Sequence, residues 1–305
     1  MRNAFAETLY DIAKDDPDVF IVVADISPGA ALAAFQDEFA ERFVNVGVSE
    51  QAMIGVCAGL ALRGCKPFAY TIATFAAYRP FEMIRDDLCY QNLPVTVVGV
   101  GGGVNYSFLG GTHHAQEDVA VMSAIPNMTV VAPCDPLEAS AATRAIMDVP
   151  GPVYLRLGKA GEPVLTEGAE PFALGKVRYL QRGDDVCILT YGPIAKLGRA
   201  LADRLTEEGR SVSIVSVHTL KPIDAEGIER ALHEHDEVIV LEEHAPTGGL
   251  ADKVKAIAWD TKAPCELRAH TLKDEFVHLY GPHETLLAAH GLDLETIAAA
   301  SGQLA

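Results

Sequence analysis

Short apolar segments alternate with amphipathic helical segments along most of the chain, and this alternation restricts the fold more than any other feature. In the first half, strands are expected at residues 19–26, 44–47, 67–73, 94–101, 128–132 and 152–157, and helices at residues 3–14, 30–43, 49–62, 75–90, 115–125 and 136–149. Apolar strands that lead into amphipathic helices are typical of a parallel sheet covered on both faces. We therefore expect a doubly wound, mainly parallel α/β domain.

The alternation is interrupted once, between residues 158 and 185, where the chain is rich in Gly, Pro and Glu. Such a composition is typical of a linker, with room for one strand. The alternation then resumes as VCILTYG, a helix at 193–208, SVSIVSV, a helix at 225–234, EVIVLEE, a helix at 249–259, and CELRAHTL. We therefore expect an α/β domain at residues 1–160, a linker at 161–178, and a second, smaller α/β domain at 179–305, which suits a length of 305 residues.

The charge and the cysteines restrict the class of protein. A formal net charge of -18 disfavours binding to nucleic acid or to anionic membranes. No apolar run reaches the roughly 18 residues of a membrane span, and the amphipathic, acidic N-terminus MRNAFAETLYDIAKDD does not resemble a targeting peptide. The six cysteines form no CxxC pair, so we expect reduced, mostly buried thiols in a cytoplasmic protein.

Glu50 lies where a short strand meets an apolar helix, in VNVGVSEQAMIGVCAGLALRG. A purely structural role is possible, because Ser49 is a good N-cap and the helix dipole favours an acid in the first turn. The helix that follows has no polar face over three turns, which predicts burial on all sides. A carboxylate at the mouth of a buried helix must be paired, hydrogen-bonded or protonated. Glu50 could therefore share a proton with a ring nitrogen of a ligand.

The stretch YTIATFAAYR, residues 70–79, runs from the end of a strand into a helix. In parallel sheets, ligands bind outside the carboxyl ends of the strands. Phe75 at such a place could stack on a flat heterocycle. The alternative is that Phe75 and Tyr78 are core residues.

A second candidate segment is Gly110-Gly111-Thr112-His113-His114, which precedes a helix. Adjacent histidines cannot both face one point, and HxxxH spacing is absent, so one catalytic histidine is favoured over a metal pair. A histidine on a loop at the sheet edge suits acid–base work near neutral pH, although a solvated loop histidine is the alternative. The glycine run at residues 101–103 fits either a weak phosphate signal or a flexible loop.

Three of these stretches resemble a known family. VGVSEQAMIGVCAGLA, ATF at the start of a helix, and GGTHHAQEDVAVMSAIPNMTVVAPCDPLEA resemble, in that order, the pyrimidine-binding domain of transketolases and deoxyxylulose-phosphate synthases. LTYGPIAKLGRAL, VSVHTLKPID and VIVLEEHAPTGGLADKV resemble their C-terminal domain, which also closes the beta subunits of 2-oxoacid dehydrogenases. The resemblance covers nearly the whole chain, and QNLPV and IPNMTVVAP are similar to the synthase and transketolase branch.

The resemblance implies roles for single residues. Glu50 would hydrogen-bond the aminopyrimidine ring of thiamine diphosphate, and Phe75 would stack on that ring. His113 matches the histidine of the family's GPTH motif, which contacts the donor near its reacting carbon. The expected cofactor-binding set is completed by Tyr70 and Asp25, and the expected substrate-binding set contains His113, His114, Arg156, Lys159 and Arg79. Arg156 falls near a basic residue that binds substrate phosphate in some members, with Lys159 as its rival.

One part of the family's pattern is absent from this sequence. Diphosphate binding requires Mg²⁺ and a GDG…N segment, and the sequence RGDD at residues 182–185 is not such a segment. The resemblance therefore implies the C-terminal subunit of a split transketolase, with no metal ligands of its own. A partner subunit would carry the diphosphate and magnesium site, in an α2β2 heterotetramer. The loop GGGVNYSFL also departs from the family, because it lacks the usual histidine and acidic residues.

The implied reaction is transfer of a two-carbon ketol unit from a ketose phosphate to an aldose phosphate. One alternative is the beta subunit of a 2-oxoacid dehydrogenase or of a deoxyxylulose-phosphate-synthase-like decarboxylating enzyme. An alternative of another class is a non-catalytic α/β partner protein.

Overall fold

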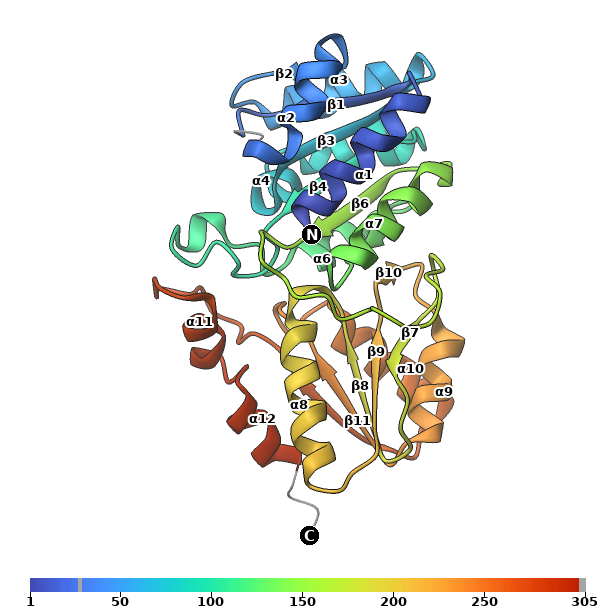
Figure 1. Cartoon of the computed structure of the whole chain (residues 1–305), viewed down its shortest axis with the longest axis vertical. Coiled ribbons are helices and arrows are strands. Elements are labelled where there is room, and N and C mark those ends of the chain that lie inside the picture. The colour runs from blue at the N-terminus through green and yellow to red at the C-terminus, as the bar shows by residue number, and fades with distance from the viewer. Residues whose placement is uncertain (27–28, 302–305) are drawn as a thin grey trace.

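The computed structural model describes residues 1–26 and 29–301, and it contains two sheets, one above the other in Figure 1. The seven-stranded sheet has the order β10-β5-β6-β4-β3-β1-β2, and the five-stranded sheet has the order β12-β11-β8-β9-β7. The strands of the first sheet are β1 (Val19–Val23), β2 (Phe43–Asn45), β3 (Lys66–Ile72), β4 (Thr96–Val100), β5 (Thr129–Val131), β6 (Val153–Leu157) and β10 (Thr219–Lys221). Those of the second are β7 (Arg178–Gln181), β8 (Val186–Thr190), β9 (Val212–Ser216), β11 (Glu237–Leu241) and β12 (Glu266–His270).

Helices cover both faces of each sheet. Those of the first domain are α1 (Arg2–Asp15), α2 (Gly29–Glu38), α3 (Glu50–Leu62), α4 (Ala73–Tyr78), α5 (Phe81–Met83), α6 (Asp118–Ala124) and α7 (Pro136–Ala145). Those of the second are α8 (Ala195–Glu207), α9 (Ala225–Glu234), α10 (Leu250–Thr261), α11 (His283–Ala289) and α12 (Leu294–Ser301). None of these helices combines the length and the hydropathy that a membrane span requires, within the residues that the structure describes.

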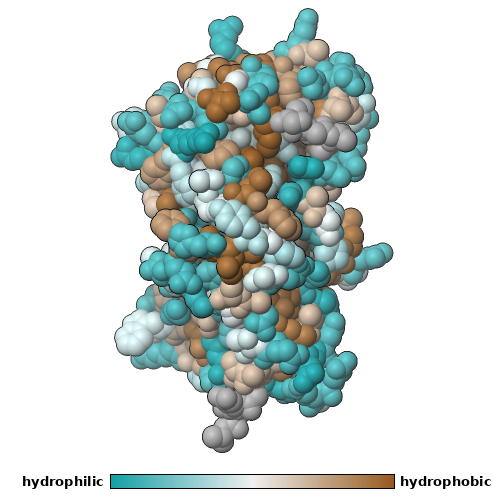
Figure 2. Space-filling view, turned by 90° about the vertical axis from the view of Figure 1, so that its left-hand side faces the viewer, coloured by the Kyte–Doolittle hydropathy of each residue, from teal (hydrophilic) through white to brown (hydrophobic). Residues whose placement is uncertain are grey.

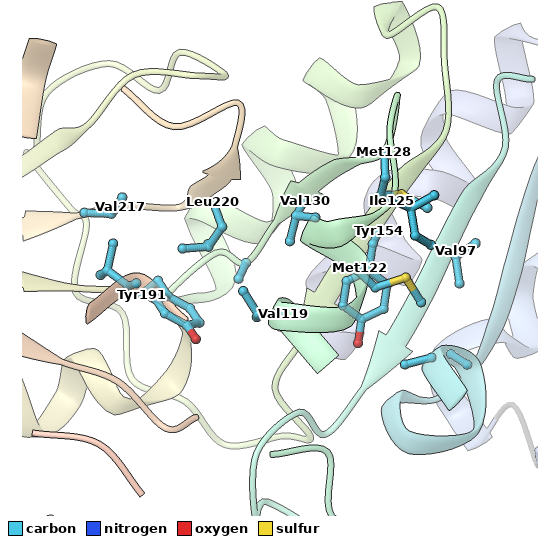
Figure 3. Close-up of a cluster of buried hydrophobic side chains, with 14 of the residues drawn as sticks. Val97, Val119, Met122, Ile125, Met128, Val130, Tyr154, Tyr191, Val217 and Leu220 are labelled. Carbon is cyan, nitrogen blue, oxygen red and sulfur yellow. The ribbon is translucent and has the colours of Figure 1, made fainter. Parts of the chain in front are cut away.

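Successive side chains of a strand point to opposite faces of the sheet. The first domain therefore has two hydrophobic cores, one on each face of its sheet. Along β1, Val22 joins the core under α3, α4 and α6, whereas Ile21 and Val23 join the core under α1, α2 and α7. The first of these cores continues into the second domain. Figure 3 shows Val119 and Val130 of the first domain approaching Leu220 and Tyr191 of the second.

An edge strand also joins the two domains. β10 lies in the second domain by sequence, yet it pairs antiparallel with β5, with Thr219 opposite Val131. Lys221, at the end of β10, donates through Nζ to the carbonyl oxygen of Ser123 at 2.9 Å. The other ladders of the first sheet are parallel. The predicted fold class, a mainly parallel α/β domain followed by a second α/β domain, is therefore confirmed, but the first sheet is completed from beyond the linker.

Several expected elements differ in detail. The helix expected at residues 75–90 is divided into α4, α5 and a π-helical turn (Ile84–Tyr90), and Pro80 stands at the break because proline cannot donate to a helix. β7 begins only at the last residue of the expected linker, and the linker is held by Asp135, whose carboxylate accepts from the backbone N–H groups of Leu165 and Thr166, both at 2.7 Å. The helices α11 and α12 were not expected from the sequence.

The prediction that the helix after Glu50 is buried on all sides is wrong. One side of α3 packs on the core through Met53, Ile54 and Cys57, while Val56 and Leu62 lie on an exposed side. A side-chain carbon placed at Gly55 or Gly59 would meet no atom within 4 Å. Small apolar residues without polar neighbours therefore gave α3 a misleading all-buried pattern.

The six cysteines are free thiols, four of them buried. Burial raises the pKa of the Cys57 and Cys187 thiols, which disfavours the thiolate needed of a nucleophile. These cysteines therefore serve as small apolar residues of the core.

Candidate functional site

The candidate site lies at the carboxyl edge of the first sheet. Glu50 opens α3 shortly after β2, Phe75 and Arg79 belong to the turn of helix that follows β3, and His113 lies on a short 3₁₀ turn after β4. The carboxyl ends of parallel strands meet at one edge, so three separate connections deliver these side chains to one place. The strand order therefore explains why these residues, which the sequence placed after separate strands, lie at the same edge of the sheet.

Glu50 is buried and paired. Its side chain is 4% exposed, and Oε1 accepts a hydrogen bond from Nη1 of Arg79 at 2.7 Å. The guanidinium carbon of Arg79 lies 3.9 Å from the centroid of the Phe75 ring. The arginine side chain itself is 43% exposed. A buried acid, an aromatic face and a solvent-facing cation thus form one contact group.

His113 completes this group. Its ring lies edge-on to Phe75, with 5.2 Å between the ring centroids, and 6.2 Å from the ring centroid of Tyr106. Burial and the nearby charge of Arg79 lower the pKa of His113, so the ring is neutral near pH 7. The neutral imidazole has one donor and one acceptor nitrogen, and Thr112 Oγ1 lies 3.0 Å from Nδ1.

His114 points elsewhere. Its side chain is buried, its pKa is lowered chiefly by burial, and neither ring nitrogen has a protein hydrogen-bond partner among the described residues. Of the two candidate histidines, the structure therefore brings His113, rather than His114, to Phe75.

The loop before these histidines is packed, so it is neither a flexible loop nor an open phosphate cradle. Gly102 and Gly103 are buried, and a side-chain carbon at either would collide with Arg156 or with Glu243. Glu243 follows β11, and its Oε1 accepts from the backbone N–H of Val104 at 2.6 Å. The glycine run is therefore explained by the close approach of side chains from β6 and from the second domain.

Arg156, an expected phosphate ligand, lies in the interior. Its side chain is 2% exposed, Nε donates to Asp118 at 2.8 Å, and Nη2 donates to the carbonyl oxygen of Glu243 at 3.1 Å. A guanidinium committed to these acceptors at the domain junction does not face a substrate. We therefore do not retain Arg156 as a phosphate ligand.

Lys159, its rival, is exposed. Nζ lies 5.1 Å from the ring centroid of Tyr106, which in turn lies beside His113. Lys159 also lines a cavity of about 450 Å³ between the first residues of the linker, α8 and α11. Of the two basic candidates on this segment, Lys159 is the one whose charged group faces solvent near the site.

The two remaining cofactor candidates lie apart from this group. Tyr70 is 1% exposed, and its ring stacks on Phe5 of α1 at 6.0 Å, so it faces the core on the opposite side of the sheet from α3. Asp25 is exposed after β1, and its backbone N–H donates to Asn45. Tyr70 is therefore a core residue, and Asp25 shares the sheet edge with Glu50.

Two residues of this region were not predicted from the sequence. Tyr106 lies in GGGVNYSFL and packs beside His113, and Glu243 holds the same loop from the second domain. The pattern of EVIVLEE predicted the strand but not the partner of its glutamate. Within residues 1–26 and 29–301, no cluster of three or more His, Cys, Asp or Glu side chains has the arrangement of a metal site.

Comparisons with known proteins decide the family. Residues 1–161 match the family described as "Transketolase, pyrimidine binding domain", and residues 175–297 match "Transketolase, C-terminal domain". The chain belongs to the transketolase family. It is 35% identical to an apulose-4-phosphate transketolase subunit from Phocaeicola vulgatus, over 97% of this chain and 94% of the relative.

Two further relatives have nearly the same extent. The putative transketolase C-terminal section of Methanocaldococcus jannaschii is 36% identical over 98% of this chain and 94% of its own length. A solved structure described as a split gene transketolase in an inactive beta4 tetramer is 33% identical, covers 98% of this chain and 96% of its own, and superposes with a TM-score of 0.88. Split-transketolase C-terminal subunits are thus the relatives that this chain matches from end to end.

The pyrimidine-binding family implies thiamine diphosphate, and the residues present fit its aminopyrimidine end. The Arg79 guanidinium is itself a flat group with N–H donors, and it lies on Phe75 while donating to Glu50. Glu50 and Phe75 thus hold a flat, N–H-donating group, and the aminopyrimidine end of the cofactor is a group of the same chemistry. The transketolase match, in turn, supports an enzyme of the transferase class.

Proposed function

We propose that this chain is the pyrimidine-binding subunit of a thiamine-diphosphate-dependent transketolase that transfers a two-carbon ketol unit between sugar phosphates. The observation that carries the proposal is the contact group of Glu50, Phe75 and His113 at the carboxyl edge of the first sheet. The cofactor supplies the carbon nucleophile that cleaves the ketose, and the protein supplies orientation and proton control.

Each residue of the group has a task that its geometry suits. Glu50 is shielded from water and accepts a hydrogen bond, so it would hold a ring N–H of the cofactor and orient the ring. Phe75 offers a half-buried aromatic face for stacking. His113 is neutral near pH 7 and only partly buried, so it would hydrogen-bond a hydroxyl or carbonyl of the donor sugar.

The active enzyme, in this proposal, needs a partner subunit that supplies the diphosphate and Mg²⁺ ligands. Exposed apolar side chains on the segments that lead to the site give a partner a surface to cover: Val48, two residues before Glu50, is 72% exposed, and Phe108, five residues before His113, is 66% exposed. Figure 2 shows apolar residues over the upper and middle parts of one face of the molecule. A two-plus-two assembly of the subunits follows the expectation drawn from the sequence.

The substrates, in this proposal, carry phosphate. The relative from Phocaeicola vulgatus is named for apulose 4-phosphate, and Lys159 presents its ammonium group near Tyr106. A lysine binds phosphate as a point charge without a fixed geometry, which suits sugars of different length.

The test is an assay of the full chain, purified together with a co-expressed subunit that carries the GDG…N segment. We expect transfer of a two-carbon unit from xylulose 5-phosphate to an aldose phosphate in the presence of thiamine diphosphate and Mg²⁺. Glu50→Gln should lower turnover by about 10²- to 10⁴-fold, because a neutral amide cannot take up and return a proton. Glu82→Gln, a nearby exposed acid, is the matched control and should leave turnover unchanged.

Other results would redirect the proposal. Release of carbon dioxide from pyruvate without ketol transfer would assign the chain to the decarboxylating branch. Full turnover of Glu50→Gln would remove this acid from the mechanism, and an assembled pair that binds no cofactor would favour a non-catalytic role.

A further inference from the structure

Arg79 fills the place that the proposed function reserves for the cofactor's ring. Its guanidinium lies 3.9 Å from the Phe75 centroid, and Nη1 lies 2.7 Å from Glu50 Oε1. These are the stacking surface and the acceptor that an aminopyrimidine would use. A guanidinium and an aminopyrimidine are both flat, delocalised groups with N–H donors at their edges. One such group excludes the other from this space.

The burial of Glu50 gives this arrangement a physical reason. A buried carboxylate that lacks a partner is destabilising. Glu50 therefore needs a donor both before and after the cofactor binds. Arg79 provides the donor in the subunit as the structure shows it, and a ring N–H would provide it in the loaded enzyme.

The side chain of Arg79 is free to leave. It is 43% exposed, and its guanidinium contacts Glu50 and the face of Phe75. Its backbone, by contrast, is held, because Gln51 Nε2 donates to the Arg79 carbonyl oxygen at 3.3 Å. The guanidinium can thus rotate into solvent on a fixed stem, and an ion pair with an exposed member is weak enough to be exchanged.

We propose that Arg79 is a displaceable occupant of the pyrimidine place: it neutralises Glu50 and covers Phe75 in the empty subunit, and it swings out when the aminopyrimidine ring enters. The inference rests on the proposed function, since it takes that ring as the incoming group. Arg79 would then reduce the affinity for the cofactor while keeping the empty site ordered.

The experiment titrates the full chain with the isolated pyrimidine end of the cofactor, 4-amino-5-hydroxymethyl-2-methylpyrimidine, and measures binding by calorimetry. Arg79→Met keeps the side-chain stem and removes the competing group. It should bind the pyrimidine roughly twofold to tenfold more tightly than wild type, the range expected when one half-exposed ion pair and one cation–π contact no longer compete. Arg85→Met, at an exposed arginine paired with Asp86, is the matched control and should bind as wild type does.

A second measurement follows the arginine itself. In ¹⁵N spectra of the arginine side chains, the Nε–H signal of Arg79 should move toward that of a free arginine as the pyrimidine is added. Arg79→Lys, which keeps the charge but cannot stack as a flat group, should give an affinity between those of wild type and Arg79→Met. This variant preserves the test if the methionine variant does not fold.

The outcomes separate the inference from the proposed function. Weaker binding in Glu50→Gln and Phe75→Ala, with tighter binding in Arg79→Met, supports both. If the first two variants bind more weakly and Arg79→Met binds equally or more weakly than wild type, the proposed function stands and displacement is overturned. If no form binds the pyrimidine, or if Glu50→Gln and Phe75→Ala bind as wild type does, the proposed function fails and the displacement fails with it.

Discussion

Glu243 of the second domain accepts a hydrogen bond from the backbone N–H of Val104 in the first domain, 139 residues earlier, at 2.6 Å. The same Oε1 accepts from Nε2 of His283 at 2.9 Å. The loop so held leads to Tyr106, which packs beside His113. The second domain therefore fixes part of the candidate site without contributing a residue to the contact group around Glu50.

Loss of this anchor should destabilise the fold. Glu243→Ala leaves the Val104 N–H and His283 without their acceptor, and we expect the free energy of unfolding to fall by about 2–4 kcal/mol. Urea denaturation measures the loss. Glu284→Ala is the control, because Glu284 is 74% exposed and its lysine partner is 3.7 Å away, and it should change stability by less than about 0.5 kcal/mol. Equal losses in the two variants would contradict the anchoring role.

The pair of His283 and Glu243 also predicts a pH dependence. Burial alone would lower the pKa of His283, but the charge and hydrogen bond of Glu243 raise it above its usual 6.5. Burial alone would raise the pKa of Glu243, but chiefly the charge of His283 holds it below its usual 4.5. The contribution of the histidine is complete below pH 6.5 and is lost as pH rises through its folded-state pKa. The contribution of the Glu243 carboxylate to stability is complete above pH 4.5 and is lost as pH falls through its folded-state pKa.

The stabilisation by this pair should therefore be greatest between the two usual values and should decline in alkali. We expect the difference in unfolding free energy between wild type and His283→Gln to be about 1–3 kcal/mol near pH 6 and clearly smaller near pH 9. Urea titrations at the two pH values measure it. A difference that grows toward pH 9 would show that the neutral histidine, rather than the ion pair, stabilises the junction.

The interior position of Arg156 predicts a structural phenotype. Arg156→Met leaves Asp118 buried without its cation, and it should lower the free energy of unfolding by about 3–5 kcal/mol. The double variant Arg156→Met with Asp118→Asn should recover part of this loss, because neither charge of this pair remains. Arg182→Met, at an arginine that is 64% exposed, should cost less than about 1 kcal/mol. Normal stability with a raised KM for phosphorylated substrates would instead restore Arg156 as a substrate ligand.

Lys159 predicts a selective effect on substrate binding. Lys159→Met should raise KM for a phosphorylated ketose by roughly tenfold to a hundredfold, the loss of one charge-assisted hydrogen bond, with little change in kcat. An unphosphorylated ketose should show no such change. Lys196→Met removes a second lysine from the rim of the same cavity and is the matched control. A larger effect of Lys196→Met would move the phosphate site toward α8.

The order of strands and helices was predictable because each depends on local periodicity. Short apolar runs between helical segments identified β1 to β6, and the junction of β2 with α3 drew attention to Glu50. The resemblance placed Tyr70 among the cofactor-binding residues, but its ring lies in the core on the other face of the sheet, because a position near the end of a strand does not determine which face a side chain occupies. The prediction that α3 is buried on all sides was wrong because the sequence of an apolar helix does not show whether a neighbouring element covers it.

Contacts between distant parts of the chain were not predictable from local pattern. The arginine in PVYLRLGK gave no sign that Asp118, 38 residues earlier, would neutralise it in the interior. The glycine run at residues 101–103 suggested an open loop because the side chains that fill its space come from β6 and from the end of β11. Similarly, the pairing of Arg79 with Glu50, 29 residues earlier, depends on the meeting of α3 with α4.

The edge strand β10 makes the region before the linker depend on the region after it, because β10 pairs with β5. Consider a chimera with the residues before the linker from one relative and the residues after it from another. Its first sheet would be completed by an edge strand from the second relative, and the contact with the end of α6 would depend on that relative's lysine. Recombination at the linker should therefore be disfavoured, and the two regions should pass between lineages as a single inherited block.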